Sequence, residues 1–476
     1  MPQSIDRRHF LVLSSALSVA AAAGRVVGAE PAGSAGSAGE AVQLIPAADQ
    51  DLFRVRMQMS VKGNVDIPKN PLASKERDRQ LPLVANSTID FEERWVRGES
   101  ELMAGAQRYY YEATSESKVE DRTQTRELRD KARRVVAHVD AGLPVLYGEE
   151  DYLTHDELEL LRTPVCSLAI DAILPAKAVA PGASWSPDTA GLARLFNLAG
   201  IQKSTVTGEV VSIDAKQAKL QFQGRIDGSI DGVPTVIELA AKAVFDRDAG
   251  AVTWFALALR EQREIGKAEP GFQVAAQVKL IRQPLEEANA VRTDDSLDFS
   301  APPPEERMMV HLDSSIGRFT VFLDRSWRMI SDAKGLTTLR MIKTDKVIAQ
   351  CDIRPLVAMK PGEQLTLEAF QADIRRSLSS RFGSFLEAEE GVNSGGLRTM
   401  RVAVQGEVEQ VPVQWVFLHF SDDSGRRVAA TFTLEATQVE AFAGADAQFA
   451  NTFRFQAAAE EPAEQQAAKA SSADRK

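Results

Sequence analysis

Residues 204–281 alternate between apolar and polar side chains with the period of two that a β-strand requires. The apolar face of successive runs is formed by Leu220 and Phe222, by alternate residues from Ile237 to Phe245, by alternate residues from Phe255 to Leu259, and by alternate residues from Phe272 to Leu280. The runs are separated by the turn sequences Asp227-Gly228, Asp231-Gly232, Asp246 to Gly250, and Glu269-Pro270-Gly271. The pattern predicts one continuous antiparallel meander.

The second face of this meander is only half polar. In the run that contains Phe255 and Leu259 it carries Trp254, Ala256 and Ala258. Apolar side chains gathered on a sheet face are typical of a covered or ligand-binding surface. We therefore expect a broad sheet, either cupped like a half-barrel or partly covered on that side. Trp254, Ala256 and Ala258 are the candidate ligand-binding residues, and the sequence leaves open whether they line a cavity.

Other elements precede the meander. Strand-like runs lie at residues 53–61, 83–96 and 107–113. Two short helices are expected after them. Thr154 and Glu157 form a capping box at the start of the first, and Pro187 marks the first turn of the second, which ends at Gly200.

Residues 308–455 have a different order of elements. A long helix is predicted between Thr366 and Gly391, because apolar residues recur there at spacings of three and four. A final helix runs from Thr437 to Phe453. The expected strands lie at 319–323, 338–342, 347–353, 397–404, 411–420 and 427–434. The whole chain is thus predicted to be α+β, with an N-terminal β-meander and short helices, followed by an antiparallel sheet with two packing helices.

The predicted organisation comprises a signal peptide at 1–29, a flexible linker at 30–48, a β-rich domain at 49–283, a Pro-rich acidic linker at 284–307, an α+β domain at 308–455, and a disordered tail at 456–476.

The first residues resemble a twin-arginine export signal. Arg7-Arg8 stand before a weakly apolar run from Leu11 to Ala23 that is too short to span a membrane. Asp6 and Val12 depart from the usual pattern, so an ordinary secretory signal is the alternative. We expect cleavage near Ala29, no transmembrane span in the mature chain, and a periplasmic or secreted location.

The net charge indicates which classes of partner are disfavoured, and the cysteine positions indicate whether a disulfide is expected. The 476 residues carry a formal net charge of −11, with a pI near 5.2. This charge disfavours nucleic acids and anionic lipid surfaces as partners. Cys166 and Cys351 are far apart in the sequence, so two buried free thiols are favoured over a disulfide bridge.

The chain offers little for catalysis or for cofactors. Asp227, Asp231, Gly232 and Glu238 fit part of a calcium-loop spacing, but the flanks alternate as strands, which favours a plain hairpin turn. The histidines are scattered, without the paired spacing of a zinc site. We predict no catalytic, cofactor-binding or metal-ligating residues, and no cofactor.

Two family resemblances can be stated. The segment Gly317 to Leu323, followed by Trp327, the long helix and Phe449-Ala450-Asn451-Thr452-Phe453 resemble the PsbP/Mog1/DcrB-like fold group. That resemblance implies a small non-catalytic binding or assembly module. The first domain, through Arg108-Tyr109-Tyr110 and Trp185, resembles a β-rich domain of exported planctomycete proteins whose function is uncharacterised.

Three functional hypotheses follow from the sequence. The leading one is an exported, non-enzymatic envelope protein that binds an apolar small molecule or an envelope protein. The alternatives are a purely structural envelope component and a hydrolase with a site assembled from scattered Asp, Glu and His residues between the domains. The sequence does not indicate an oligomeric state.

Overall fold

The computed structural model describes residues 41–67, 79–98, 103–140, 142–266, 270–292, 297–333 and 335–456. The predicted signal peptide, most of the first linker and nearly all of the C-terminal tail lie outside the described residues. The chain forms two compact units. The first comprises the chain up to Val310 with Asp324–Ile330 and Arg340–Ile348, and the second comprises the remainder.

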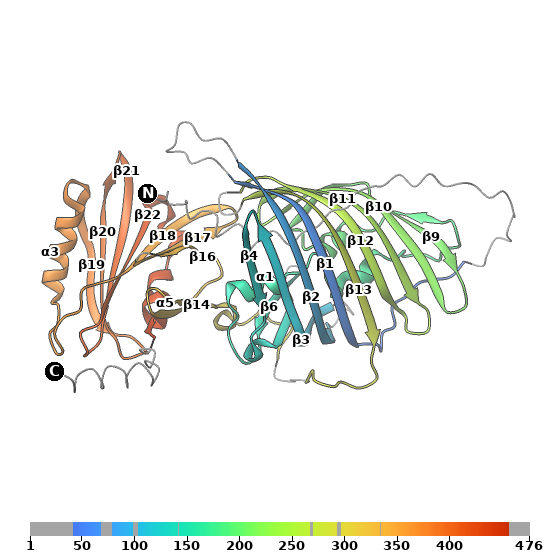
Figure 1. Ribbon diagram of the computed structural model, residues 1–476, viewed down its shortest axis with the longest axis horizontal. Coiled ribbons are helices and arrows are strands. Elements are labelled where there is room, and N and C mark those ends of the chain that lie inside the picture. The colour runs from blue at the N-terminus through green and yellow to red at the C-terminus, as the bar shows by residue number, and fades with distance from the viewer. Residues whose placement is uncertain are drawn as a thin grey trace, which may run out of the picture. The chain divides into compact units, whose positions relative to one another are not determined.

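The first unit is built on a 13-stranded antiparallel sheet (Figure 1). Its main path runs β6-β5-β3-β2-β1-β13-β12-β11-β10-β9-β7, with β4 beside β3 and β8 beside β10. The strands are β1 (Leu52–Ile67), β2 (Arg79–Arg97), β3 (Met103–Val119), β4 (Arg122–Glu127), β5 (Arg134–Asp140), β6 (Leu143–Gly148), β7 (Ser184–Trp185), β8 (Gly200–Ser204), β9 (Thr207–Ile213), β10 (Gln217–Ile230), β11 (Val233–Asp246), β12 (Ala251–Arg263) and β13 (Gly271–Pro284). The path has two ends, β6 and β7, so the sheet is open, and the predicted meander forms one half of it.

The turn between β10 and β11 is the two-residue type that sequence patterns identify well. Asp231 and Gly232 both have positive φ, 51° and 88°, as a type I′ hairpin requires. The other predicted turn, Asp227-Gly228, was wrong. Both residues lie inside β10, at the point where its pairing with β8 shifts register. The Asp-Gly pair therefore marks a β-bulge and not a reversal of the chain.

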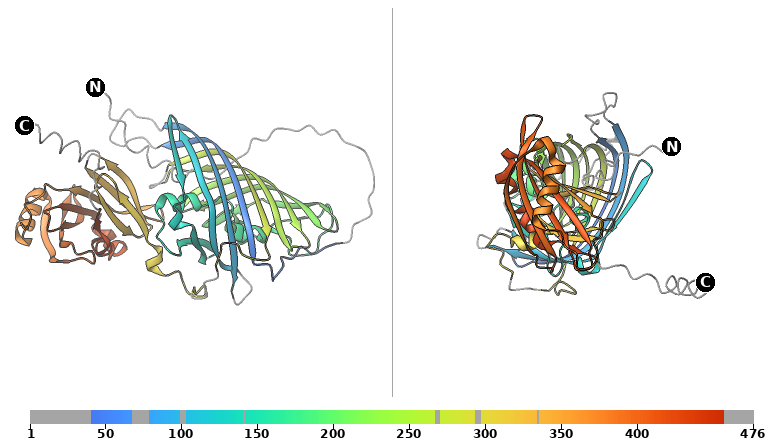
Figure 2. Two further views of the ribbon diagram at one scale, coloured as in Figure 1. Left: turned by 60° about the horizontal axis from the view of Figure 1, so that its bottom comes forward. Right: turned by 90° about the vertical axis from the view of Figure 1, so that its left-hand side faces the viewer.

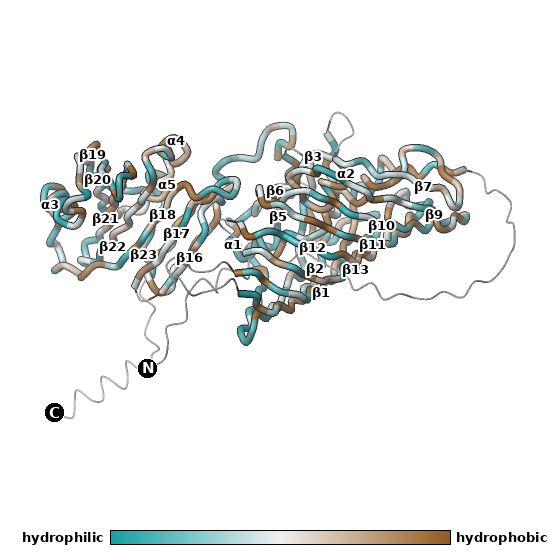
Figure 3. The backbone as a smooth tube through the Cα atoms, turned by 90° about the horizontal axis from the view of Figure 1, so that it is seen from above, coloured by the Kyte–Doolittle hydropathy of each residue, from teal (hydrophilic) through white to brown (hydrophobic). Residues whose placement is uncertain are grey.

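One face of the large sheet packs into the core of the unit. Alternate residues of β1 and β10–β13 are buried there together with the helices α1 (His155–Leu161) and α2 (Thr189–Leu195) and the 3₁₀ segment η3 (Ser167–Ile173). Figure 2 shows the long strands side by side from β2 to β10, with the short helices beside them. The alternation of hydrophobic and hydrophilic residues along these strands is visible in Figure 3.

The two short helices begin as N-cap chemistry dictates. Thr154 caps α1 in a complete capping box with Glu157, as predicted. Helix α2 starts later than predicted, because Pro187 lies before the helix and Asp188 is its N-cap. The Asp188 carboxylate accepts the Gly191 N–H at 3.1 Å.

The second unit contains most of a 7-stranded sheet in the order β16-β17-β18-β22-β21-β20-β19 and a 3-stranded sheet in the order β14-β15-β23. The strands are β14 (Val310–Ser314), β15 (Phe319–Leu323), β16 (Trp327–Ala333), β17 (Leu336–Lys343), β18 (Lys346–Pro355), β19 (Phe382–Val392), β20 (Arg398–Val408), β21 (Val411–Ser421), β22 (Arg427–Glu435) and β23 (Arg454–Phe455). In Figure 1, α3 (Leu367–Leu378) lies on one face of the larger sheet and α5 (Ala445–Thr452) on the other.

The prediction of one long helix was wrong for the second half of that segment. Thr366 caps α3 as expected, but the helix ends at Leu378, and Phe382–Val392 form strand β19. Register shifts between Phe382 and Ser384 and between Phe385 and Glu387 break the alternation of this strand. The bulges leave apolar residues at a spacing of three, which imitates a helical stripe.

The final helix is broken in two. A turn from Val439 to Phe442, α4, is separated from α5 by Gly444, whose φ of 80° is left-handed. Such a glycine ends a helix readily, because it has no Cβ to clash in that conformation. No helix among the described residues is long and apolar enough to cross a membrane.

Candidate functional site

A groove of about 800 Å³ crosses the large sheet of the first unit on the face opposite its apolar core. Among its walls are Met59, Val278, Leu257, Ala241 and Phe222, which are direct neighbours across successive strands. Their side chains are buried in the core. Because strand side chains alternate, the residues just before and after each of them point to the opposite face and form the groove.

Two rows of side chains line the groove. The first, called the lysine row, consists of Gln58, Lys279, Ala256, Lys242, Gln221, Glu209 and Ser184. The second, called the alanine row, consists of Ser60, Gln277, Ala258, Ala240, Gln223 and Thr207. Every neighbouring pair in each row is an antiparallel cross-strand pair, so the groove runs across the strands and not along them.

The middle of the groove is lined by alanines. Ala240 pairs with Ala258, and Ala256 lies one step along the same face of β12. Alanine is depleted in strands because it packs little surface against its neighbours. Three alanines at adjoining positions therefore leave space above the backbone where larger side chains would stand, and they give the groove an apolar floor.

Two lysines flank that floor. Lys242 and Lys279 are both exposed and are the cross-strand neighbours of Ala256, one on each side. The acid in the same row, Glu209, accepts a hydrogen bond from Gln221 Nε2 at 2.9 Å. An apolar strip with cationic groups on both sides suits a ligand that has an apolar body and an anionic or polar end.

The candidate residues from the sequence are only partly brought together here. Ala256 and Ala258 line the groove, whereas Trp254 does not. Trp254 lies on the same face two residues away, half-buried between its cross-strand partners Val244 and Ile281. These three side chains extend the apolar surface beyond the lysine row, and Ile281 is 39% exposed.

Sequence reasoning missed the two lysines and the glutamines of the groove. Their signal was present, since Lys242, Ala240 and the polar positions of β13 alternate with core residues. What the sequence lacked was the register between strands, which alone places Lys242 and Lys279 beside Ala256.

Buried acids of the first unit are engaged in structural contacts. Glu93 accepts hydrogen bonds from Arg108 Nε at 3.2 Å and from Ser167 Oγ at 2.8 Å. Glu261 is paired with Arg263 at 2.7 Å. Burial raises the pKa of Glu261 to about 7 although the Arg263 guanidinium opposes that rise.

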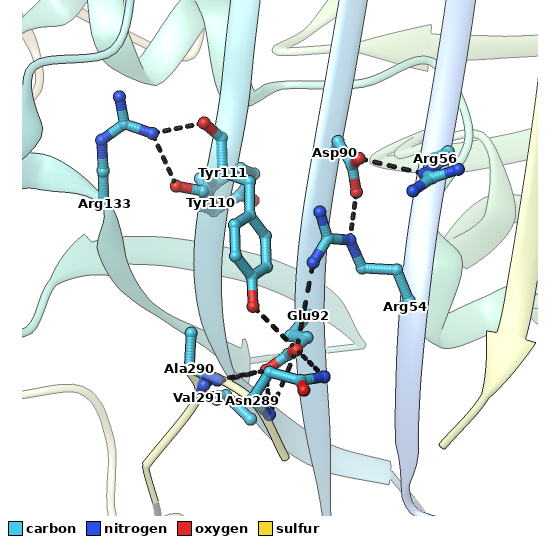
Figure 4. A network of polar contacts seen from close by, with 10 residues as sticks. All are labelled: Arg54, Arg56, Asp90, Glu92, Tyr110, Tyr111, Arg133, Asn289, Ala290 and Val291. Carbon is cyan, nitrogen blue, oxygen red and sulfur yellow. Dashed lines mark hydrogen bonds and ion pairs between the residues drawn. The ribbon is translucent and has the colours of Figure 1, made fainter. Parts of the chain in front are cut away.

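Glu92 of β2 is the centre of another such network (Figure 4). Its carboxylate accepts the main-chain N–H groups of Ala290 and Val291 at 2.8 and 3.0 Å and the Tyr111 hydroxyl at 2.8 Å. Burial alone would raise its pKa, but these donors and Asn289 outweigh burial and lower the pKa of Glu92 to about 2. The predicted linker is therefore tied to β2 at Asn289–Val291.

The described residues form neither a metal site nor a reactive cysteine. Within the described ranges no cluster of three His, Cys, Asp or Glu side chains could hold a metal ion. Of the calcium-loop candidates, Asp231 and Gly232 form the hairpin turn, and Asp227 binds Arg225 at 2.8 Å. Cys166 and Cys351 are free and buried, as predicted, and burial raises the pKa of both thiols.

No protein-family model matches the chain, and no curated protein matches it. Among solved structures, cyanobacterial PsbP from Synechocystis aligns with 31% of this chain and 92% of its own, at 9% identity and a TM-score of 0.26. The Ran-binding protein Mog1p of Saccharomyces cerevisiae aligns with 31% of this chain and 95% of its own, at 9% identity and a TM-score of 0.25. Lipovitellin aligns with 56% of this chain but only 29% of its own, at 12% identity and a TM-score of 0.30. Similarity at this level concerns the fold of parts of the chain and says nothing about what they bind.

Proposed function

We propose that this protein is an exported, non-enzymatic binding protein whose large sheet holds an elongated, mainly apolar ligand across its strands. The observation that carries the proposal is the groove of about 800 Å³ with alanines on its floor. Its size lies within the range of small-molecule sites, which are mostly apolar with a few placed polar groups.

The groove supports a specific orientation. The apolar body of the ligand lies over Ala240, Ala256 and Ala258, and its polar end lies beside Lys242 and Lys279. The adjoining surface of Trp254 and Ile281 offers further apolar contact to a longer ligand. Export rests on the sequence pattern of residues 1–29 and remains part of the proposal.

A binding role is favoured over hydrolysis by the state of the buried acids. Glu93 and Glu261 are each paired with an arginine, and Glu92 is held by main-chain donors. Glu92 and Glu93 are occupied by these donors, which makes them poor general bases. Glu261 has a pKa of about 7 but is only 2% exposed, so its carboxyl group does not reach a substrate.

The test is a titration with cis-parinaric acid, an elongated polyene carboxylate that fluoresces when it enters an apolar site. Ala258→Trp fills the groove and should weaken binding at least about tenfold, a loss of roughly 1.4 kcal/mol. Gln262→Trp is the matched control, because Gln262 is exposed on the same face of β12 but outside the groove. Equal binding by the wild type, Ala258→Trp and Gln262→Trp would refute the proposal.

The role of the lysines can be separated in the same assay. Lys242→Gln combined with Lys279→Gln should weaken the binding of cis-parinaric acid but not the binding of its methyl ester, because only the acid carries a charge for the lysines to attract. If the double variant binds the acid and the ester with equally reduced affinity, the lysines do not recognise the anionic end.

A further inference from the structure

A second, smaller pocket lies elsewhere in the first unit, away from the groove residues. It has a volume of about 300 Å³. It is lined by the end of β2, by β5 and β6, by η3 and by α2, so distant parts of the chain meet there. Its apolar walls are Pro46, Trp95, Val139, Pro144, Leu168 and Ala169.

The polar groups of this pocket are mainly donors. Arg97 and Arg194 both line it, and no carboxylate of the described residues forms an ion pair with either one. Arg97 Nη2 donates to the main-chain oxygen of Ala47 at 3.0 Å, while its Nε has no acceptor. Arg194 Nε also has no acceptor in the described part of the chain.

The acid in the wall does not balance these charges. Asp171 is bound through both oxygens to Arg282 Nη2, at 2.7 and 2.6 Å. Arg282 does not line the pocket but takes up the charge of Asp171, so the positive charges of Arg97 and Arg194 in the wall have no counter-ion among the described residues. A buried or half-buried cation without a partner is unfavourable, and a bound anion relieves that cost.

Trp95 adds a further unsatisfied donor and a flat wall. It is 94% buried, being 6% exposed, and its indole Nε1 has no hydrogen-bond partner among the described residues. Its ring lies 5.8 Å from the Arg97 guanidinium and 5.0 Å from that of Arg282. The pocket thus combines a rigid aromatic and proline wall with cationic groups.

From this combination we infer that the pocket is a binding site for a compact organic anion, namely a small apolar body that carries one carboxylate. The apolar part lies against Trp95, Pro144 and Leu168, and the carboxylate lies between Arg97 and Arg194. The volume of about 300 Å³ is at the lower end for small-molecule sites and suits a ligand more compact than the one proposed for the groove. The two sites are therefore separate in both position and ligand.

The test uses 2-naphthoate and its neutral isostere 2-naphthamide in isothermal titration calorimetry on the full chain. The wild type should bind 2-naphthoate at least about tenfold more tightly than 2-naphthamide, because only the anion satisfies the arginines. Arg194→Met should abolish that preference. It breaks no hydrogen bond or ion pair of the described residues, so the fold is expected to survive.

Two controls make the outcome decisive. Lys177→Met removes an exposed lysine outside the pocket and should leave 2-naphthoate binding unchanged. Ala258→Trp, which fills the groove, should also leave it unchanged. The inference is overturned if 2-naphthoate fails to bind, if 2-naphthamide binds as tightly, or if Arg194→Met keeps the preference of the wild type.

Discussion

The Arg282 guanidinium donates through Nη2 to both carboxylate oxygens of Asp171, at 2.7 and 2.6 Å, inside the first unit. Arg282 is 1% exposed and also donates through Nε to the main-chain oxygen of Val252 at 2.9 Å. Asp171 in turn accepts the Val252 N–H at 2.9 Å. This pair joins η3 to strands β12 and β13 and so fixes the segment that covers the core face of the sheet.

Removing one member of this pair should be strongly destabilising. Asp171→Asn leaves the Arg282 charge buried without its anion, and we expect a loss of about 3 kcal/mol in the free energy of unfolding. Urea denaturation followed by tryptophan fluorescence measures it. Replacing both residues, Asp171→Leu with Arg282→Met, should lose less than the single change, because no charge is left unpaired. A double variant less stable than Asp171→Asn would contradict this account.

The Glu92 network predicts a dependence on acid pH. The pKa of Glu92 is lowered to about 2, so its contribution is complete above about pH 4.5 and is lost as the pH falls towards 2. Glu92→Gln should lose about 2 kcal/mol of stability at pH 7, since charged hydrogen bonds become neutral ones. Hydrogen exchange of the Ala290 and Val291 amides reports the effect locally. Unchanged protection of those amides in Glu92→Gln would show that Glu92 does not hold the segment.

Glu261 predicts the opposite dependence. Burial raises the pKa of Glu261 to about 7. The stability that its protonated form contributes is therefore fully present below about pH 4.5 and is lost as the pH rises through 7. The stability of Glu261→Gln relative to the wild type should therefore be higher at pH 8 than at pH 5. Thermal unfolding at the two pH values checks this. If the variant and the wild type keep a constant difference in Tm, Glu261 does not titrate in this window.

His419 offers a test in the second unit. It is 1% exposed, its ring lies 5.7 Å from that of Phe370, and neither ring nitrogen has a partner in the described chain. Burial, together with Arg427 and Arg398, lowers its pKa to about 4, so stability is lost as the pH falls from 6.5 to 4. His419→Leu should gain about 1 kcal/mol at pH 7 and should flatten that loss. Urea denaturation at pH 7 and pH 5 gives both values, and a destabilised variant would show that the imidazole makes a favourable contact.

The sequence predicted the parts of the fold that depend on local pattern. Alternation identified the core faces of β10 to β13, and the capping residues Thr154 and Thr366 identified two helix starts. It failed where a bulge disturbs the period, as at Phe382 and Phe385 in β19. A register shift of this kind depends on the partner strand, which a single run of sequence does not reveal.

The candidate sites show the same limit. Ala256 and Ala258 could be singled out because both lie on one strand with an unusually apolar second face. Lys242 and Lys279 belong to other strands, and only the cross-strand register brings them to Ala256. The small pocket left no sequence signal, because Trp95 and Arg194 come from segments about a hundred residues apart and meet only through packing.

The central claim is that the groove holds an elongated ligand. Native mass spectrometry of the protein recovered from the cells that produce it tests this claim most directly. The account predicts that the wild type and Gln262→Trp carry an added non-covalent mass, that denatured extracts release an apolar or amphipathic molecule of that mass, and that Ala258→Trp carries none. A wild type recovered at the mass of the bare chain would contradict the claim, as would an Ala258→Trp protein that keeps the added mass.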